Sequence, residues 1–162
     1  MPTPTLDAPL RELSGFANHS KPWLILAGTL AVLGGPRGRR AALTGVAAIG
    51  VASLVVNQPM KLIGARSRPA RQQHGIPESR WVPMPTSTSF PSGHSASAAA
   101  FAVAVGSVLP ALAIPVGASA AVVAFSRVYT GVHYPGDVLV GVGTGALLGG
   151  LCARVGRRVG RG

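Results

Sequence analysis

Charged residues and cysteine are both scarce in this sequence. Only 12% of its 162 residues are charged, and four residues are acidic, whereas roughly 25% of an ordinary soluble domain is charged. The single cysteine, Cys152, excludes a disulfide bond within the chain. It lies at the end of an apolar run, where we expect an inert packing residue. No small-residue cleavage site follows the first apolar run, so we expect no secretory signal peptide.

Apolar residues make up 48% of the sequence, and the net charge is +11. In a soluble protein such a charge would suggest binding to nucleic acid. Here the cations occur in short clusters between long apolar runs, which is the pattern of loops that flank membrane spans. We therefore predict an integral-membrane protein whose partners are membrane lipids and not nucleic acid. The length favours a single domain, residues 1–162.

Five apolar runs predict an all-α fold, a membrane helical bundle of about five transmembrane helices. A segment that crosses the bilayer must be helical, because lipid cannot satisfy the backbone hydrogen bonds of irregular chain. The first run is short, since a span needs about 20 residues. The third and fourth runs could instead form one helical hairpin that does not cross fully. The runs cover residues 22–35, 41–60, 95–109, 111–125 and 138–153.

The two terminal segments are more polar than these runs. Residues 1–20 carry a weak helical stripe that includes Leu6, Leu10 and Leu13. This spacing predicts a short amphipathic helix at the membrane interface, and a frayed terminus is the alternative. Residues 154–162 form a basic tail.

Three glycines in the fifth run, Gly141, Gly145 and Gly149, recur every four residues. Small residues at this period let helix backbones approach closely in lipid. The pattern predicts a close contact between two helices, either within one monomer or between two chains.

With five spans, the loops fall on two sides of the membrane. The turn at residues 37–40, the turn at Pro110 and the basic tail share one side. The N-terminus and the loops 61–90 and 126–137 share the other side. Arginine is frequent in the first turn and in the tail, and the positive-inside rule places that side in the cytoplasm. The polar loops are therefore expected to face outward.

The longest polar segment, residues 61–94, separates the second and third apolar runs. A loop of this length without regular structure is uncommon in a compact domain and is usually functional or disordered. It holds five of the 15 lysines and arginines and ends in Pro91-Ser92-Gly93-His94, where a helical run begins. The free N–H groups and the dipole of a helix N-terminus favour an anion, as do nearby cations. We therefore predict a phosphate site here.

A second polar segment, residues 126–137, contains Arg127, His133 and Asp137. Ionisable residues at membrane depth are rare and usually functional. A carboxylate close to an imidazole fixes its tautomer and stabilises its cation, so that the other ring nitrogen becomes a competent nucleophile. Taken alone, each residue has an ordinary explanation, such as a headgroup anchor or a polar helix cap. Together with residues 61–94 they indicate one cluster of cations, imidazoles and a carboxylate on one membrane face.

Three motifs in these segments resemble the signature of the type 2 phosphatidic acid phosphatase superfamily. All three parts are complete and in order. The resemblance covers residues 61–137 and implies a small bacterial membrane member, with one span fewer than the common six-helix pattern. The motifs are Lys61, six residues, Arg68-Pro69; then Pro91-Ser92-Gly93-His94; then Ser126-Arg127, five residues, His133, three residues, Asp137.

The resemblance also implies a mechanism. One histidine attacks phosphorus to form a phosphohistidine, an aspartate orients it, and a second histidine protonates the leaving oxygen, a task that suits a group of near-neutral pKa. Basic side chains bind the phosphoryl oxygens, so no metal or other cofactor is expected. The implied catalytic residues are His133 as nucleophile, Asp137 and His94, and the implied phosphate-binding residues are Lys61, Arg68, Ser92, Gly93 and Arg127.

The sequence therefore predicts an integral-membrane lipid phosphatase. The expected substrate is a lipid phosphate or diphosphate, such as an isoprenoid phosphate or diphosphate, phosphatidic acid or phosphatidylglycerol phosphate. Transfer of the phosphoryl group to a second lipid is an alternative, as is a vanadium-type haloperoxidase, although known members of that branch are soluble. A catalytically silent lipid-headgroup binding subunit is a further alternative, but binding alone would not require both histidines and the aspartate.

Overall fold

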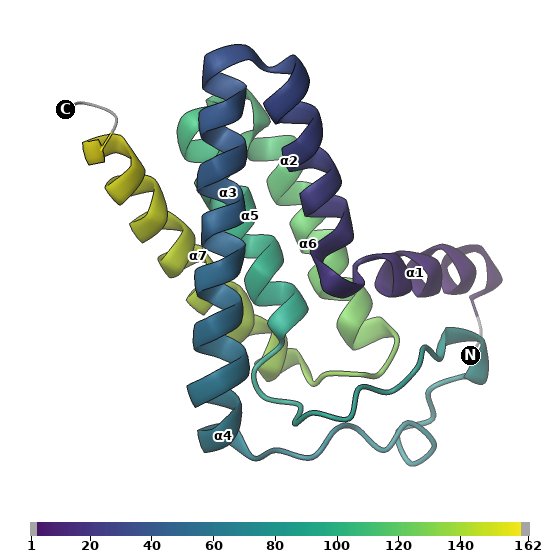
Figure 1. The fold of residues 1–162 in the computed structure, drawn as a ribbon. Coiled ribbons are helices and arrows are strands. Elements are labelled where there is room, and N and C mark those ends of the chain that lie inside the picture. Colours follow the sequence, from purple (N-terminus) through teal and green to yellow (C-terminus); the bar gives the residue numbers. More distant parts are fainter. Residues whose placement is uncertain (1–2, 160–162) are drawn as a thin grey trace.

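The computed structural model describes residues 3–159, and this part of the chain is a bundle of helices without strands (Figure 1). Residues 1–2 and 160–162 lie outside the described part, and with them Arg161 of the predicted basic tail. The helices are α1 (Pro4–Phe16), α2 (Lys21–Leu33), α3 (Gly35–Val55), α4 (Lys61–Gly64), α5 (Gly93–Val108), α6 (Ala113–Tyr129) and α7 (Pro135–Val159).

Three helices in the described part are long and apolar enough to cross a membrane. They cover Gly35–Gly64, Pro110–Tyr129 and Pro135–Arg158, with 30, 20 and 24 residues. The first of these joins α3 to α4 through a π-helical turn over Val56–Met60. α2 has 13 residues and α5 has 16, whereas a full span needs about 20. The all-α membrane class is thus confirmed, and the five predicted runs each contain a helix.

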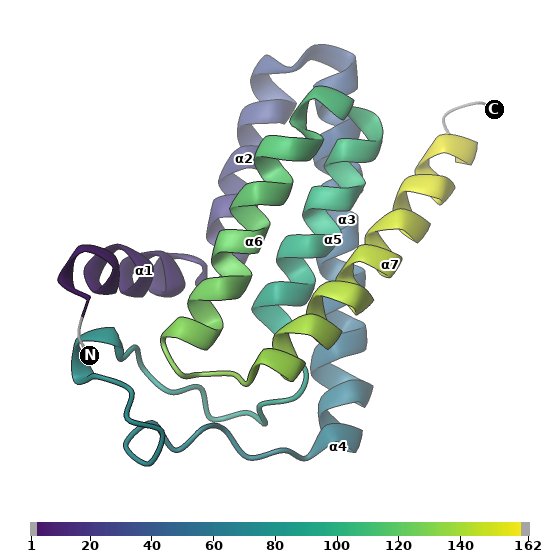
Figure 2. The same ribbon diagram turned by 180° about the vertical axis from the view of Figure 1, so that it is seen from behind.

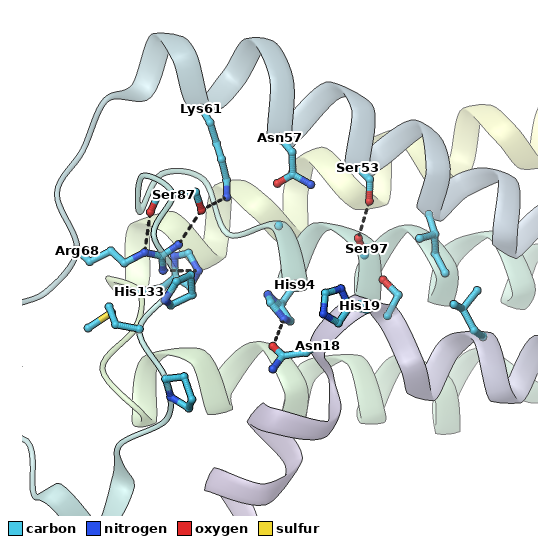
Figure 3. Close-up of a pocket in the computed structure, with 17 residues that line it drawn as sticks. Asn18, His19, Ser53, Asn57, Lys61, Arg68, Ser87, His94, Ser97 and His133 are labelled. Carbon is cyan, nitrogen blue, oxygen red and sulfur yellow. Dashed lines mark hydrogen bonds between the residues drawn. The ribbon is translucent and has the colours of Figure 1, made fainter.

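Pro59 explains the π-helical turn within the long helix. Proline has no N–H to continue an α-helical ladder, and residues 56–60 adopt the wider turn around it. Such distortions are frequently found at functional sites. Asn57 and Lys61 both project from this part of the helix toward the cavity described below (Figure 3).

The central helix is α5, which packs against α3, α6 and α7 (Figures 1 and 2). Its sequence is rich in alanine, and side chains such as Ala96 and Ala98 are fully buried. Small side chains let the surrounding helices approach closely. Phe101 fills the space toward α2, where its ring centroid lies 5.6 Å from that of Trp23. Because His94 lies in the first turn of α5, the packing of this helix also places His94.

The glycine stripe of α7 faces α5. A Cβ atom at any of the three positions would collide with the α5 backbone, so only glycine permits this approach. The contact lies within one chain, which decides between the two predicted uses of the stripe. A Cβ built on Gly141, Gly145 and Gly149 would lie 2.5, 2.1 and 2.4 Å from the carbonyl oxygens of Ser92, Ala96 and Ala100.

Helix α1 projects to one side from the foot of α2, above the long loop, and the buried Asp7 anchors it there (Figure 1). The Asp7 carboxylate accepts hydrogen bonds from Ser79 Oγ at 2.6 Å, Arg80 Nε at 2.9 Å and the Tyr129 hydroxyl at 2.6 Å. The bonds from Ser79 and Tyr129 hold the pKa of the Asp7 carboxyl well below its usual range. The N-terminal helix is therefore present and docked on the long loop and α6, and a frayed terminus is wrong.

The polar loops gather at one end of the bundle. The long loop 65–92, the turn 130–134 and α1 lie at the lower end in Figure 1, whereas the α2–α3 and α5–α6 turns lie at the upper end. Arg40 near the start of α3 donates to the carbonyl oxygen of Gly156 in α7 at 3.0 Å. The arginine-rich turn and the end of α7 are thus neighbours, as the predicted division of loops requires.

The α5–α7 contact predicts that Gly145→Ala destabilises the protein by about 1–3 kcal/mol, because the added methyl group would overpack the contact with Ala96. The free energy of unfolding in detergent micelles measures the effect. Gly143→Ala is the matched control, since a Cβ there meets no atom within 4 Å and alanine is the better helix former. Equal stabilities of the two variants would contradict the close contact.

Candidate active site

A cavity of about 670 Å³ opens at the end of the bundle that carries the polar loops. Its walls come from the segment after α1, from α3, α4 and α5, from the long loop and from the turn before α7. Figure 3 shows that polar side chains from these elements point toward one another across it. Five of the residues predicted from the sequence line it, namely Lys61, Arg68, Gly93, His94 and His133.

Arg68 joins the long loop to the turn that carries His133. Its guanidinium donates to the carbonyl oxygens of Ser87 and Val132 at 2.8 Å each, and to that of Thr88 at 3.2 Å. The NH1 atom of Arg68, which donates to Val132, also lies 3.4 Å from His133 Nε2. Backbone acceptors therefore hold a positive charge beside one nitrogen of this imidazole.

Lys61 and Arg68 converge on one oxygen atom. The Nζ atom of Lys61 donates to Ser87 Oγ at 2.8 Å, and NH2 of Arg68 lies 3.2 Å from the same atom. Hydrogen bonds from two cations are strongest when the acceptor is itself charged. This point of the cavity is consequently suited to an anionic oxygen. Ser87 carries no motif signal, and the sequence did not identify it.

The His133 side chain is buried between Arg68 and Asp137, with 3% of the residue exposed. Its Nδ1 atom lies 3.7 Å from Asp137 Oδ2 and makes no hydrogen bond within the described residues. Burial, together with the guanidinium groups of Arg68 and Arg127, holds the pKa of His133 well below its ordinary value, and the Asp137 carboxylate offsets this only in part. The imidazole is therefore neutral at pH 7 and keeps a lone pair on one nitrogen.

The carboxylate of Asp137 is fully buried and well supplied with donors. Ser89 Oγ donates to Oδ2 at 2.5 Å, the backbone N–H of Tyr134 donates to Oδ2 at 2.9 Å, and Arg66 NH1 donates to Oδ1 at 3.1 Å. The bond from Tyr134 also caps the first turn of α7. Arg66 additionally lies over the Tyr134 ring, 4.0 Å from its centroid. Arg66 and Ser89 were not predicted, and no motif position marked them.

The N-terminus of α5 brings the second histidine into the cavity. Ser92 is the N-cap residue, and its buried side chain accepts a hydrogen bond from the N–H of Ser95 at 3.4 Å. Ser92 thus caps the helix and does not line the cavity, whereas Gly93 does. A Cβ on Gly93 would lie 3.0 Å from Asn57 Oδ1, so the close approach of the π-helical turn after α3 favours glycine. His94 follows, and its Nε2 lies 2.9 Å from Asn18 Oδ1.

Arg127 lies behind the cavity and is 1% exposed. Its NH1 atom donates to the carbonyl oxygen of Ser14 at 2.9 Å and lies 2.6 Å from Ser14 Oγ. Its Nε atom has no hydrogen-bond partner within the described residues. The side chain is close enough for its charge to act on both His94 and His133. The family resemblance assigned Arg127 to the phosphate-binding residues. In the structure Arg127 lies next to the other residues of that set, and its Nε–H is a donor that no described residue uses.

A sequence-family model, that of the PAP2 superfamily, matches residues 41–161 of the chain. Two relatives are decaprenylphosphoryl-5-phosphoribose phosphatases. The protein from Mycobacterium tuberculosis is 37% identical over 157 residues, which cover 94% of this chain and 82% of the relative. The protein from Mycolicibacterium smegmatis is 38% identical over 138 residues, which cover 81% of this chain and 68% of the relative.

Two solved structures share the fold. A transmembrane PAP2-type phosphatidylglycerolphosphate phosphatase from Bacillus subtilis superposes with a TM-score of 0.73 at 25% identity, covering 98% of this chain and 80% of that one. LpxE from Aquifex aeolicus superposes with a TM-score of 0.65 at 23% identity, covering 97% and 88%. The apolar helices of this chain are thus arranged as in a transmembrane protein.

The lowered pKa predicts that His133 stays neutral as the pH falls from 7 to 5, a range in which an ordinary histidine gains its proton. Nitrogen-15 NMR of histidine-labelled protein in detergent micelles measures the titration, with His133→Gln to assign the signal. Arg68→Gln removes a positive neighbour, so the pKa should rise toward 6.5. Arg39→Gln, at the exposed start of α3, should leave the titration unchanged. Protonation of His133 above pH 6 in the unmodified protein would contradict this account.

Proposed function

We propose a mechanism and a substrate class for this chain. The chain belongs to the PAP2 superfamily and is a lipid phosphate phosphatase of that family. In the proposal it hydrolyses a phosphate ester of a membrane lipid through a phosphohistidine at His133. The observation that carries the proposal is the position of this imidazole. Its Nε2 atom lies beside Arg68 at the cavity, and its Nδ1 atom faces the carboxylate of Asp137.

The first step uses the lone pair of His133 Nε2. This nitrogen attacks phosphorus, the bond from phosphorus to the lipid oxygen breaks, and the imidazole becomes positively charged. The proton on Nδ1 points to the buried carboxylate of Asp137, which stabilises that charge as it develops. The present separation of 3.7 Å shortens as the charge increases. Catalytic hydrogen bonds are often long before substrate binds.

His94 completes the exchange of protons. The negative charge of the bound phosphate favours the protonated form of His94, and in the first step this imidazolium gives its proton to the leaving lipid oxygen. In the second step water attacks the phosphohistidine, the bond between phosphorus and nitrogen breaks, and neutral His94 accepts the proton of that water. Inorganic phosphate leaves, and both histidines return to their starting forms. Atoms and charges therefore balance over the two steps.

The chain's own cations bind the phosphoryl oxygens in this mechanism. Lys61 and Arg68 already share an acceptor oxygen on Ser87, which marks the position of one phosphoryl oxygen. The N–H of Gly93 and the positive end of the α5 dipole add to the binding, and Arg127 contributes its charge from behind. Phosphoryl transfer depends mainly on positioning and on stabilisation of negative charge, and this arrangement supplies both.

The polar wall of the cavity indicates the substrate class. Beyond the cations, Ser53 of α3 faces Ser97 of α5, with 3.5 Å between their hydroxyl oxygens, and Asn57 of the π-helical turn lies beside them (Figure 3). The Asn57 amide would meet hydroxyl groups of a substrate, whereas an acyl chain would leave this amide without a hydrogen-bond partner. The Mycobacterium tuberculosis relative acts on decaprenylphosphoryl-5-phosphoribose, as its name says. We infer that the substrate here is a sugar phosphate linked to a polyprenyl lipid.

We also propose a membrane orientation with five spans. α2 and α5 are short but lie packed among the longer helices, so both are included with α3–α4, α6 and α7. The first turns of α3, with Arg37, Arg39 and Arg40, lie at the end of the bundle opposite the polar loops. Basic residues favour the cytoplasmic side, so the cavity opens on the extracytoplasmic face of the cell membrane.

The mechanism predicts that His133→Ala lowers the turnover of a lipid phosphate by about a thousandfold or more, because the nucleophile is lost. Phosphate release in detergent with a chelator present measures this loss. His74→Ala, an exposed histidine of the long loop, is the matched control and should retain activity. Rapid acid-free quenching with radiolabelled substrate should trap the phosphoryl group on His133. Normal turnover by His133→Ala would refute the mechanism.

The polar wall predicts a selective effect of Asn57→Leu. Loss of one hydrogen bond to a substrate hydroxyl should lower kcat/KM for a polyprenyl-linked pentose phosphate about tenfold, and should leave phosphatidic acid, whose phosphate bears no sugar, nearly unaffected. The ratio of the two kcat/KM values is the measurement. Ser119→Ala, an exposed serine of α6, is the control. An equal loss for both lipids would contradict the sugar-binding role of this wall.

A further inference from the structure

We propose that the last turn of α1 and the short turn that follows it position two residues of the active site, with Asn18 orienting His94 and Ser14 orienting Arg127. The inference rests on the proposed roles of His94 and Arg127. The matched part of the family model begins at residue 41, so both positioning residues lie outside it. Ser14 lies in the last turn of α1 and Asn18 at the start of the 3-10 turn that follows, and each makes a direct contact with a motif residue.

The contact between Asn18 and His94 orients the imidazole at the cavity. His94 Nε2 lies 2.9 Å from Asn18 Oδ1, so the amide oxygen holds a proton on that nitrogen and sets the plane of the ring. Figure 3 shows the two side chains meeting at the wall of the cavity. The charged and titratable groups that face His94 are Lys61, Arg68, Arg127, His133 and His19. All of these are cations or bases, and Asn18 supplies an acceptor among them.

The backbone around Asn18 supports a functional reading. His19 and Ser20 have φ angles of 57° and 58°, the left-handed region that residues with a side chain rarely occupy. This bend turns the chain from α1 into α2 and leaves Asn18 pointing into the cavity. Unfavourable backbone angles persist only where the surrounding structure imposes them, and they cluster at functional sites.

The contact between Ser14 and Arg127 joins α1 to the phosphate-binding set. Ser14 is fully buried in the last turn of α1, where carbonyl groups have no partner within the helix. Its carbonyl oxygen and its hydroxyl both bind NH1 of Arg127. The guanidinium of Arg127 therefore caps the C-terminal turn of α1 and is held in one orientation. Asp7 fixes the other end of α1 to the long loop.

The pH dependence of turnover tests the role of Asn18. A carboxylate at this position favours the protonated imidazole, so Asn18→Asp should move the alkaline limb of the kcat profile up by about one pH unit. Asn18→Leu removes the acceptor, so it should move the limb down and lower kcat at pH 7 about tenfold or more. KM should change little in both variants. Opposite shifts by two variants of one residue are not produced by a loss of folding alone.

Ser14→Ala and Glu12→Gln complete the experiment. Ser14→Ala keeps the carbonyl contact and loses the hydroxyl, so KM should rise severalfold for phosphatidic acid and for the polyprenyl-linked pentose phosphate alike. Glu12→Gln alters an exposed residue of the same helix and should behave as the unmodified protein. Wild-type pH profiles in both Asn18 variants would overturn the positioning role. If His94→Ala were active, the proposed mechanism itself would fail, which separates the two failures.

Discussion

The buried carboxylate of Asp137 is the interaction on which the active site depends. A buried ion is tolerated only where donors and opposite charge replace the lost water. Asp137 finds them in Arg66 and Ser89 of the long loop and in the N–H of Tyr134. Its own carbonyl oxygen accepts the N–H of Ser92 at the start of α5. One residue thus joins the loop, the turn and two helix N-termini, which cannot separate without leaving a buried charge unpaired.

The apolar scaffold and the site have a common origin in the contact between α5 and α7. Lipid provides little hydrophobic drive for helix association, so close packing of small residues supplies much of it. Alanines on α5 and the glycines of α7 bring the two backbones together. The contact starts at Gly141, against Ser92, and so sets the distance between the first turns of the two helices. Those turns carry His94 and Asp137, and looser packing of the glycine stripe would move His94, the proposed general acid, away from His133, the proposed nucleophile.

The sequence predicted the helices and the motif residues better than the contacts that orient them. Apolar runs located each bundle helix, although α3 begins at Gly35 and not at residue 41, because exposed arginines in its first turns resemble a loop. That Lys61 and Arg68 lie in one site was predicted from the family motif and not from the spacing of apolar residues. Asn18 gave no signal, since its partner lies 76 residues away. Contacts of that kind depend on tertiary packing, which neither spacing nor composition encodes.

A loop with almost no regular structure can serve as a rigid wall of the active site because arginines order it. Arg68 binds carbonyl oxygens of its own loop and of Val132 in the facing turn. Arg71, also buried, donates to the carbonyls of Val82 and Gly131 at 2.8 and 3.4 Å. These bonds take the place of a helical or strand ladder, and their ordering cost is met during folding. The cations are therefore in position before substrate arrives, which is the condition for strong electrostatic stabilisation of a transition state.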